Sequence, residues 1–280
     1  MKKTVLTMAL CACAATSVQA AEWSDTSIGV RTGSRFREPF NGADIHKNII
    51  DINHASGYAY GTNFFNLDVL LSSKDDPSAP GASSGAQEFY LVYRNTISYA
   101  KVSGKEFALG PVSDVGLTLG FDVNTKDDAG YNSKKRMLVV GPTFSIKAPG
   151  LLNVGIYGLW ESNAPNNEFT GVATPRYRYD THPMLGAVWA FPIAASGWSF
   201  EGFANWIASK GKDEFGNQTA PETNIDMQVM YDFGPLVGAK PKTWRAGFEY
   251  QYWHNKFGND SKRVPGASAS TPMVKAEYHF

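Results

Sequence analysis

The last eight residues of the chain, Met273-Val274-Lys275-Ala276-Glu277-Tyr278-His279-Phe280, decide its fold. Successive side chains of a β-strand point to opposite faces. Every second residue from Val274 to Phe280 is apolar, and the residues between them are Lys275, Glu277 and His279. One apolar face and one charged face in a single strand is typical of a transmembrane β-barrel, which has lipid outside and water inside.

The same alternation recurs earlier in the chain. Apolar side chains occupy every second position of the segments 65–71, 115–123, 225–233 and 244–252. None of these apolar sets contains a charged residue. An Arg or Lys at the bilayer midplane costs about 2–4 kcal/mol, so this absence is expected of a lipid-facing surface.

The alternation and the turn signals together predict twelve antiparallel strands. The strands are expected near 23–33, 46–56, 58–73, 86–103, 107–124, 134–148, 151–163, 178–194, 197–210, 222–234, 242–256 and 272–280. Tight turns are expected at 56–57, 103–105, 148–150 and 195–196, with a longer one at 235–241. Long connections, rich in Gly, Pro, Asn, Asp and Lys, are expected at 34–45, 74–85, 125–133, 164–177, 211–221 and 257–271. Short periplasmic turns that alternate with long external loops are expected of this class, and an even strand count places both ends in the periplasm.

Aromatic residues on the outward face fall into two predicted belts, as is typical of side chains that favour the two headgroup levels. The periplasmic belt comprises Phe144, Phe191, Trp198, Tyr231, Phe233, Trp244, Tyr278 and Phe280, and the external belt Phe89, Trp160, Trp206, Tyr250 and Tyr252. The terminal Phe280, two positions after Tyr278, also resembles the signal by which the assembly machinery recognises bacterial outer-membrane barrels. Pro142 and Pro192 each remove a ladder donor, so they are expected at bulges or strand ends.

Composition and the N-terminus limit the other possibilities. The 280 residues include 26 Lys and Arg against 26 Asp and Glu, with no basic block, which argues against a nucleic-acid partner. Residues 1–20 have the three parts of a secretory signal peptide, so 21–280 are expected to form a single barrel domain in the bacterial outer membrane. Cys11 and Cys13 fall in the segment to be removed, and the histidines show no metal-ligand spacing. Neither a metal site nor a cofactor is therefore expected.

The inward positions of the predicted strands form the candidate pore lining and solute-binding set. This set comprises Phe64, Asn66, Asp68, Tyr90, Arg94, Glu201, Phe203, Asn205, Asp226, Arg245 and Glu249. A purely aqueous channel does not need large rings facing its water. Rings beside carboxylates and Arg suit a flat, neutral, polar solute, because the rings stack on its face and the charged groups bond its hydroxyl and amine groups.

The run from Tyr60 to Ser72, Tyr-Gly-Thr-Asn-Phe-Phe-Asn-Leu-Asp-Val-Leu-Leu-Ser, resembles the early-strand motif of the Tsx-like nucleoside-specific channels and their OmpK relatives. Gly141-Pro142 and the aromatic C-terminal strand are similar as well. The resemblance implies a passive outer-membrane channel that favours nucleosides. It also implies that Phe64, Asn66 and Asp68 face the solute.

Two other function classes stay open at this point. Outer-membrane lipid-hydrolysing enzymes use a His and a Ser two residues apart, and the chain has His54-Ala55-Ser56, both on the outward parity. A structural or adhesive barrel would act through its loops, where Asp75-Asp76 and Asp127-Asp128 are candidates to hold divalent ions that bridge lipopolysaccharide. The expected partners are a small polar solute, outer-membrane lipid and lipopolysaccharide, and the assembly machinery at the C-terminal strand.

Overall fold

A computed structural model describes residues 21–167 and 170–280 as one closed, antiparallel β-barrel of twelve long strands. The long strands are β1 (Trp23–Glu38), β2 (Asn41–Tyr58), β3 (Gly61–Ser72), β4 (Gln87–Ser98), β5 (Val112–Asp127), β6 (Arg136–Ile146), β7 (Leu151–Asn163), β9 (His182–Ile193), β10 (Trp198–Ile207), β11 (Glu222–Asp232), β12 (Trp244–His254) and β13 (Ser268–His279). The two-residue β8 (Tyr177–Arg178) lies in the connection between β7 and β9. The predicted twelve-stranded barrel is confirmed, while the predicted signal peptide, 1–20, lies outside the described residues.

The first and last strands close the barrel. β13 pairs with β12 on one side and with β1 on the other, where Ile28 lies opposite Tyr278 and Thr32 opposite Val274. Each of the other long strands also pairs on both sides, so the described barrel has no unpaired sheet edge.

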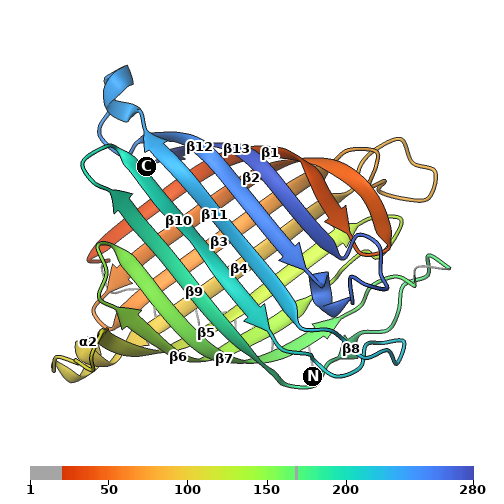
Figure 1. The fold of residues 1–280 in the computed structure, drawn as a ribbon, viewed down its shortest axis with the longest axis horizontal. Helices are drawn as coiled ribbons and strands as arrows, with labels where there is room; N and C mark the ends of the chain where they lie inside the picture. The colour runs from red at the N-terminus through yellow and green to blue at the C-terminus, as the bar shows by residue number, and fades with distance from the viewer. Residues whose placement is uncertain (1–20, 168–169) are drawn as a thin grey trace, which may run out of the picture.

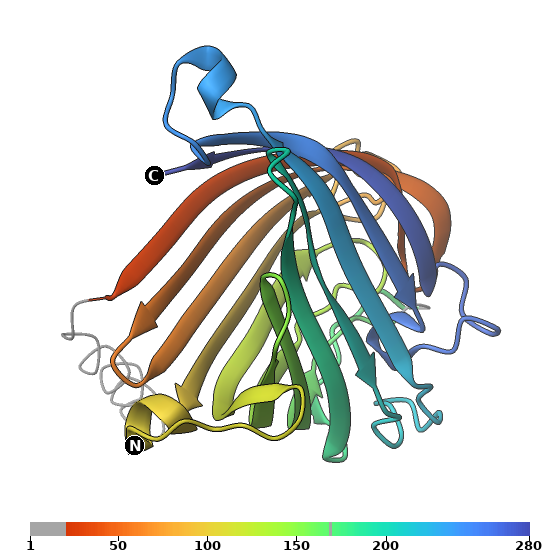
Figure 2. The ribbon, with the colours of Figure 1, turned by 60° about the vertical axis from the view of Figure 1, so that its left-hand side comes forward.

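The barrel has two ends of different character (Figure 1). The terminal end holds the start of β1, the end of β13, the short helix α2 (Tyr99–Ser103) and the 3-10 turn η1 (Gly234–Val237). The loop end holds β8, the 3-10 turn η2 (Lys256–Gly258) and the longer connections. Figure 2 shows the strands running obliquely around the barrel from one end to the other.

Three predicted connections differ from the structure. The tight turn expected at 56–57 falls at 59–60, because β2 extends to Tyr58 and β3 starts at Gly61. The long loop expected at 34–45 is mostly strand, because β1 extends to Glu38 and β2 starts at Asn41. A bulge between Gly33 and Phe36 shifts the register and brings Phe36 and Glu38 to the inner face. The tight turn expected at 103–105 is instead a longer connection, 99–111, that includes α2.

The two prolines differ from each other. Pro192 is the next-to-last residue of β9, as predicted for a residue that cannot donate to the ladder. Pro142 lies inside β6, opposite Leu117 of β5. The pairing of β6 with β7 is interrupted at Gly141 and Pro142 and resumes at Thr143. The N–H group that Pro142 lacks is therefore not needed for pairing with β7. The expectation of a bulge or strand end at Pro142 is therefore wrong.

Aromatic side chains form a row on the outer surface at the terminal end. The ring centroids of Trp198 and Tyr231 lie 5.0 Å apart, and those of Trp244 and Tyr278 lie 4.6 Å apart. Tyr278 also makes an edge contact with Phe280 at 5.1 Å. The row crosses β10 to β13, as expected of a belt at a headgroup level.

No helix in residues 21–167 and 170–280 is long and apolar enough to cross a membrane.

The outward ring of Tyr278 allows a test of whether the apolar face of β13 is needed to form the barrel. Tyr278→Asp is expected to prevent formation of the barrel, because it puts a charge on the apolar face of the strand that pairs with both β1 and β12. Tyr278→Phe keeps the ring and serves as the matched control. A folded barrel resists detergent and runs faster on a gel unheated than boiled. Equal heat-dependent migration of both variants would contradict the prediction.

Candidate functional site

Arg31 of β1 is the centre of a charged cluster on the inner face. Its Nη2 lies 2.6 Å from Oδ2 of Asp68, its Nη1 3.4 Å from Oδ1 of Asp51, and its Nε 3.3 Å from Oε1 of Glu249. A Cβ on Gly29 would lie 2.5 Å from the Asp51 carboxylate, so the glycine makes room for that side chain. The guanidinium suits this position because it presents several donors in a fixed plane.

Lys275 and Arg245 extend the cluster along β13 and β12. The Lys275 Nζ lies 2.9 Å from Oε1 of Glu277 and 3.3 Å from Oε2 of Glu249, and it donates to Oε1 of Gln228 at 3.0 Å. Arg245 forms ion pairs with Glu201 and with Glu277. We call these groups, with Asp51, Asp68, Arg31 and the neighbouring Asp226, the lumen network.

The lumen network contains more acids than bases. Its three bases are Arg31, Arg245 and Lys275, and its six acids are Asp51, Asp68, Glu201, Asp226, Glu249 and Glu277. These side chains are largely removed from bulk water. Interactions between charges are stronger there than at an exposed surface, so the excess of acids dominates the local field.

All eleven predicted lining residues lie on the inner face of the barrel. Five of them, Asp68, Glu201, Asp226, Arg245 and Glu249, belong to the lumen network, and Asn66 donates to Asp68 at 3.3 Å. Arg94 pairs separately with Asp122 of β5 at 2.5 Å. Cross-strand pairing puts Phe64 beside Arg94, Tyr90 beside Asp68, Phe203 beside Asp226 and Asn205 beside Asn224. Their roles in solute binding stay predictions.

Sequence reasoning did not select Arg31 or Asp51. The signal was present, because Ile28 and Val30 alternate with Gly29 and Arg31 as outward and inward residues. Arg31 stands out only when several strands are brought together, since its three acidic partners come from β2, β3 and β12.

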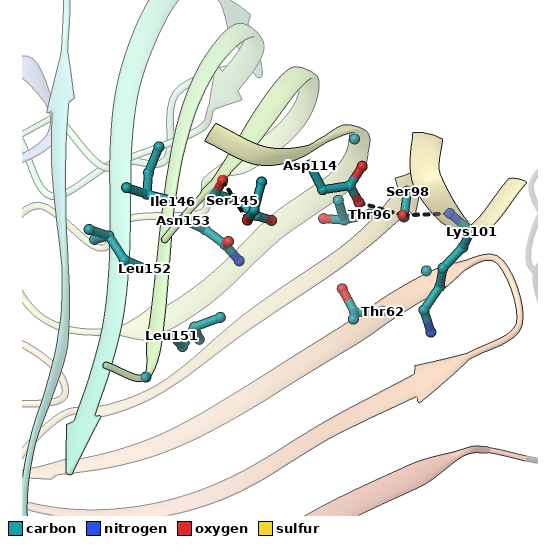
Figure 3. Close-up of a pocket in the computed structure, with 14 residues that line it drawn as sticks. Thr62, Thr96, Ser98, Lys101, Asp114, Ser145, Ile146, Leu151, Leu152 and Asn153 are labelled. Carbon is teal, nitrogen blue, oxygen red and sulfur yellow. Dashed lines mark hydrogen bonds between the residues drawn. The ribbon is translucent and has the colours of Figure 1, made fainter. Parts of the chain in front are cut away.

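The lumen is hollowed at the terminal end. A cavity of about 290 Å³ is lined by polar groups of neighbouring strands, among them Thr62, Thr96, Asp114, Ser145 and Asn153 (Figure 3). At its rim Ser98 donates to Asp114 at 2.5 Å and caps the amide of Lys101 in α2. The short helix is therefore fixed beside this mouth.

The loop end contains a second cluster of charges. Glu38 accepts from Lys47 at 2.5 Å and lies 3.0 Å from the Lys256 ammonium and 3.6 Å from that of Lys126. Lys126 also lies 2.9 Å from Asp76 and 2.9 Å from Asp128. Glu38 is 4% exposed, so β1, β2, β5 and the connection after β12 are tied together away from water.

Aromatic rings meet beside this charge cluster. Tyr131 stacks on Phe257 with centroids 5.9 Å apart and an interplanar angle of 18°, and Phe257 contacts Trp253 at 5.6 Å. Phe40 packs against Tyr131 at 5.9 Å. Tyr131 follows β5 and Phe257 follows β12, which lie half-way around the ring of twelve strands from each other. The stack therefore crosses the lumen, and we call these four rings the loop-end closure.

Part of the inner wall is apolar, which the sequence analysis did not predict. Met137 and Val139 of β6, Leu159 of β7, Met184 of β9 and Ile207 of β10 form a buried cluster on the inner face. Around the ring, β7 lies opposite β1 and its Arg31. The inner face thus has a charged region around Arg31 and, on the opposite side of the ring, an apolar cluster that adjoins the buried Glu161–Lys210 ion pair.

Residues considered for the other function classes have different partners. The ring nitrogen Nδ1 of His54 hydrogen-bonds the Thr26 hydroxyl at 2.8 Å, and not Ser56. Among the acid pairs proposed for divalent ions, Asp76 and Asp128 are buried against Lys126. Both observations weaken the alternative interpretations.

Comparisons with known proteins support the fold. No family model matches the chain, and no curated protein matches it. An outer membrane channel from Pseudomonas putida F1 is similar with a TM-score of 0.52 and 11% identity, covering 94% of this chain and 98% of that one. The NanC porin is similar with a TM-score of 0.51 and 13% identity, covering 90% of this chain and 98% of that one. Both comparisons show similarity of fold.

The burial of Arg31 predicts a large effect on stability. Arg31→Gln leaves Asp51, Asp68 and Glu249 without their shared cation, and we expect the free energy of unfolding to fall by about 3–5 kcal/mol. Denaturant unfolding of the barrel in detergent measures this. Arg37→Gln is the matched control, because the Arg37–Asp44 pair is about half exposed and worth about 0–1 kcal/mol. Equal losses in the two variants would contradict the role given to Arg31.

Proposed function

We propose that the chain is a channel of the bacterial outer membrane for the passive uptake of small polar solutes, with nucleosides as the favoured class. The lumen network is the observation that carries the proposal. A polar interior is common to outer-membrane barrels, so charge alone does not indicate selection among solutes. Here charges, amides and rings line the same interior, which suits selection among polar solutes.

Nucleosides fit the kinds of group that line the lumen. A flat base stacks on an aromatic side chain for roughly 1–3 kcal/mol, and Phe64 and Phe203 are lumen-facing rings. The ribose hydroxyls would donate to acceptors such as Asp68, Glu201 and Asn205. Contacts of this strength allow release on the far side, which conduction requires. The resemblance of the Tyr60–Ser72 run to the Tsx-like channels favours the same class.

Passage also requires movement at the loop end. The stack of Tyr131 on Phe257 lies across the path, and Glu38 holds three lysines beside it. Both rings belong to connections, which move more readily than paired strands. The channel proposed here therefore opens when these connections separate.

The cellular setting is part of the proposal. Removal of residues 1–20 would release the barrel domain, and the aromatic end of β13 would engage the assembly machinery of the outer membrane. The outward aromatic row would then lie at a headgroup level, in contact with lipid, while the loop end faces lipopolysaccharide.

Nucleoside block of the ionic current tests the solute class. In planar bilayers, adenosine or thymidine at millimolar concentration is expected to reduce the current. Phe203→Ala is expected to raise the half-blocking concentration about tenfold or more, because a stacking surface is lost. Phe89→Ala removes an outward ring, 46% exposed, and is the matched control. A current that neither nucleoside reduces would overturn the nucleoside proposal while keeping the channel.

The loop-end closure makes a separate prediction. Phe257→Ala removes an aromatic contact worth about 0.5–1.5 kcal/mol, so the open fraction of the channel should rise roughly two- to tenfold. Single-channel recording measures that fraction. Phe215→Ala, an exposed ring in the connection between β10 and β11, should leave it unchanged. An unaltered open fraction in Phe257→Ala would show that the stack does not limit passage.

A further inference from the structure

Three acceptor side chains lie in a row on the inner face of β11. Glu222, Asn224 and Asp226 are alternate residues of the strand, so their side chains point to the same face and neighbouring ones stand about 7 Å apart. The pairing of Asn224 with Asn205 on β10 and with Trp253 on β12 fixes the row between two inward-facing neighbours. We call Glu222, Asn224 and Asp226 the acceptor ladder.

The acceptor ladder has more acceptor atoms than donors. Trp253 Nε1 donates to Glu222 Oε1 at 2.8 Å, and Gln251 Nε2 donates to Asp226 Oδ2 at 3.1 Å. Glu222 Oε2 and Asn224 Oδ1 are buried and accept no hydrogen bond from any described residue. Glu222 is only 2% exposed. A buried acceptor without a donor is costly, so a ligand that brings donors gains this free energy on binding.

The charges around the ladder favour a positive ligand. Asp226 belongs to the lumen network, whose six acids outnumber its three bases. Lys135, in the connection before β6, responds to the same field: burial opposes its charge, yet Tyr90, Glu161 and Glu222 hold the pKa of its ammonium above the ordinary value. Acidic groups of this region, Glu222 among them, thus already stabilise one ammonium group of the chain.

The ladder faces the lumen. Asn224 and Asp226 are only partly buried, in contrast to Glu222. Phe203 lies beside Asp226 in the β10–β11 pairing and offers an apolar surface at the same level. Glu222 lies deeper, under Trp253 of the loop-end closure. A solute that enters from the terminal end would meet Asp226 first and Glu222 last.

We propose that the acceptor ladder is a binding site for solutes that present hydrogen-bond donors on a positively charged edge, that is, protonated amines. Among neutral solutes, those with amine and hydroxyl donors, nucleosides included, bind the same site best, although more weakly than protonated amines. Solutes that carry carboxylate or phosphate groups are excluded, because they bring more negative charge and more acceptors to a site that already has more acceptors than donors. This inference rests on the proposed channel function and names the solute chemistry of its lumen.

Three small probes of similar length test the site in planar bilayers: 1,4-diaminobutane, 1,4-butanediol and succinate. The diamine is expected to block the current at a concentration at least tenfold lower than the diol, and succinate is expected not to block. The reversal potential in a KCl gradient should show a preference for K⁺ over Cl⁻. Equal block by diamine and succinate, or a preference for Cl⁻, would overturn the inference but keep the channel.

Substitutions in the acceptor ladder test whether the diamine blocks the current by binding there. Glu222→Gln and Asp226→Asn each keep the shape of the side chain and remove its charge, and each should raise the half-blocking concentration of the diamine about tenfold. Asp44→Asn is the matched control, because Asp44 is an exposed acid paired with Arg37. Heat-dependent migration on a gel shows whether each variant is folded. Unchanged block in both folded ladder variants would refute the site.

A calorimetric titration separates this inference from the channel proposal. The intact barrel in detergent is titrated with 1,4-diaminobutane, and the titration is repeated with the Asp226→Asn barrel. Heat of binding that is lost in the variant supports the ladder even if the barrel carries no current, in which case only the channel proposal fails. No heat of binding and no block would overturn the ladder, whatever the current.

Discussion

Pairing of every long strand with two neighbours is the constraint on which the rest of the structure depends. In a bilayer no water satisfies a free N–H or C=O group, so a spanning sheet must close on itself. The pairing of β1 with β13 provides this closure. It also decides where polar side chains go, since alternation sends every second residue inward. The charges of twelve strands thereby meet in one narrow interior, where each must find partners.

Those partners come from distant parts of the chain, which explains both the rigidity and the chemistry of the lumen. Arg31 joins acids from three other strands, and Glu38 joins lysines from β2, β5 and the connection after β12. Taking charges out of water is costly unless they are paired. The acids of the lumen network outnumber its bases. In the acceptor ladder, Glu222 Oε2 and Asn224 Oδ1 accept no hydrogen bond from any described residue. In the proposed channel, such an interior would favour solutes that bring hydrogen-bond donors and positive charge.

The sequence predicted which face of each strand lies inside, because a period of two is a property of the strand alone. Asp68 and Glu249, two of the residues predicted to face inward, form ion pairs with Arg31 inside the barrel. The sequence missed what depends on irregular backbone or on distant contacts. The bulge after Gly33 reverses the alternation, so Phe36 and Glu38 turn inward within a segment predicted to be loop. The stack of Tyr131 on Phe257 joins two connections across the barrel, and no local pattern indicates which loops meet.

The two unlike walls of the lumen bring these observations together. Arg31 and its acidic partners line one side, and the hydrocarbon cluster around Leu159 lines the side opposite. A small inorganic cation gains from the charged wall only, and an apolar molecule gains from the hydrocarbon wall only. A flat solute with a donor-bearing edge and an apolar face contacts both walls favourably at the same time. An anion is repelled by the first wall and is not solvated by the second. If the barrel conducts as proposed, the arrangement of the two sides of the lumen, more than any single residue, would restrict the class of solute that passes.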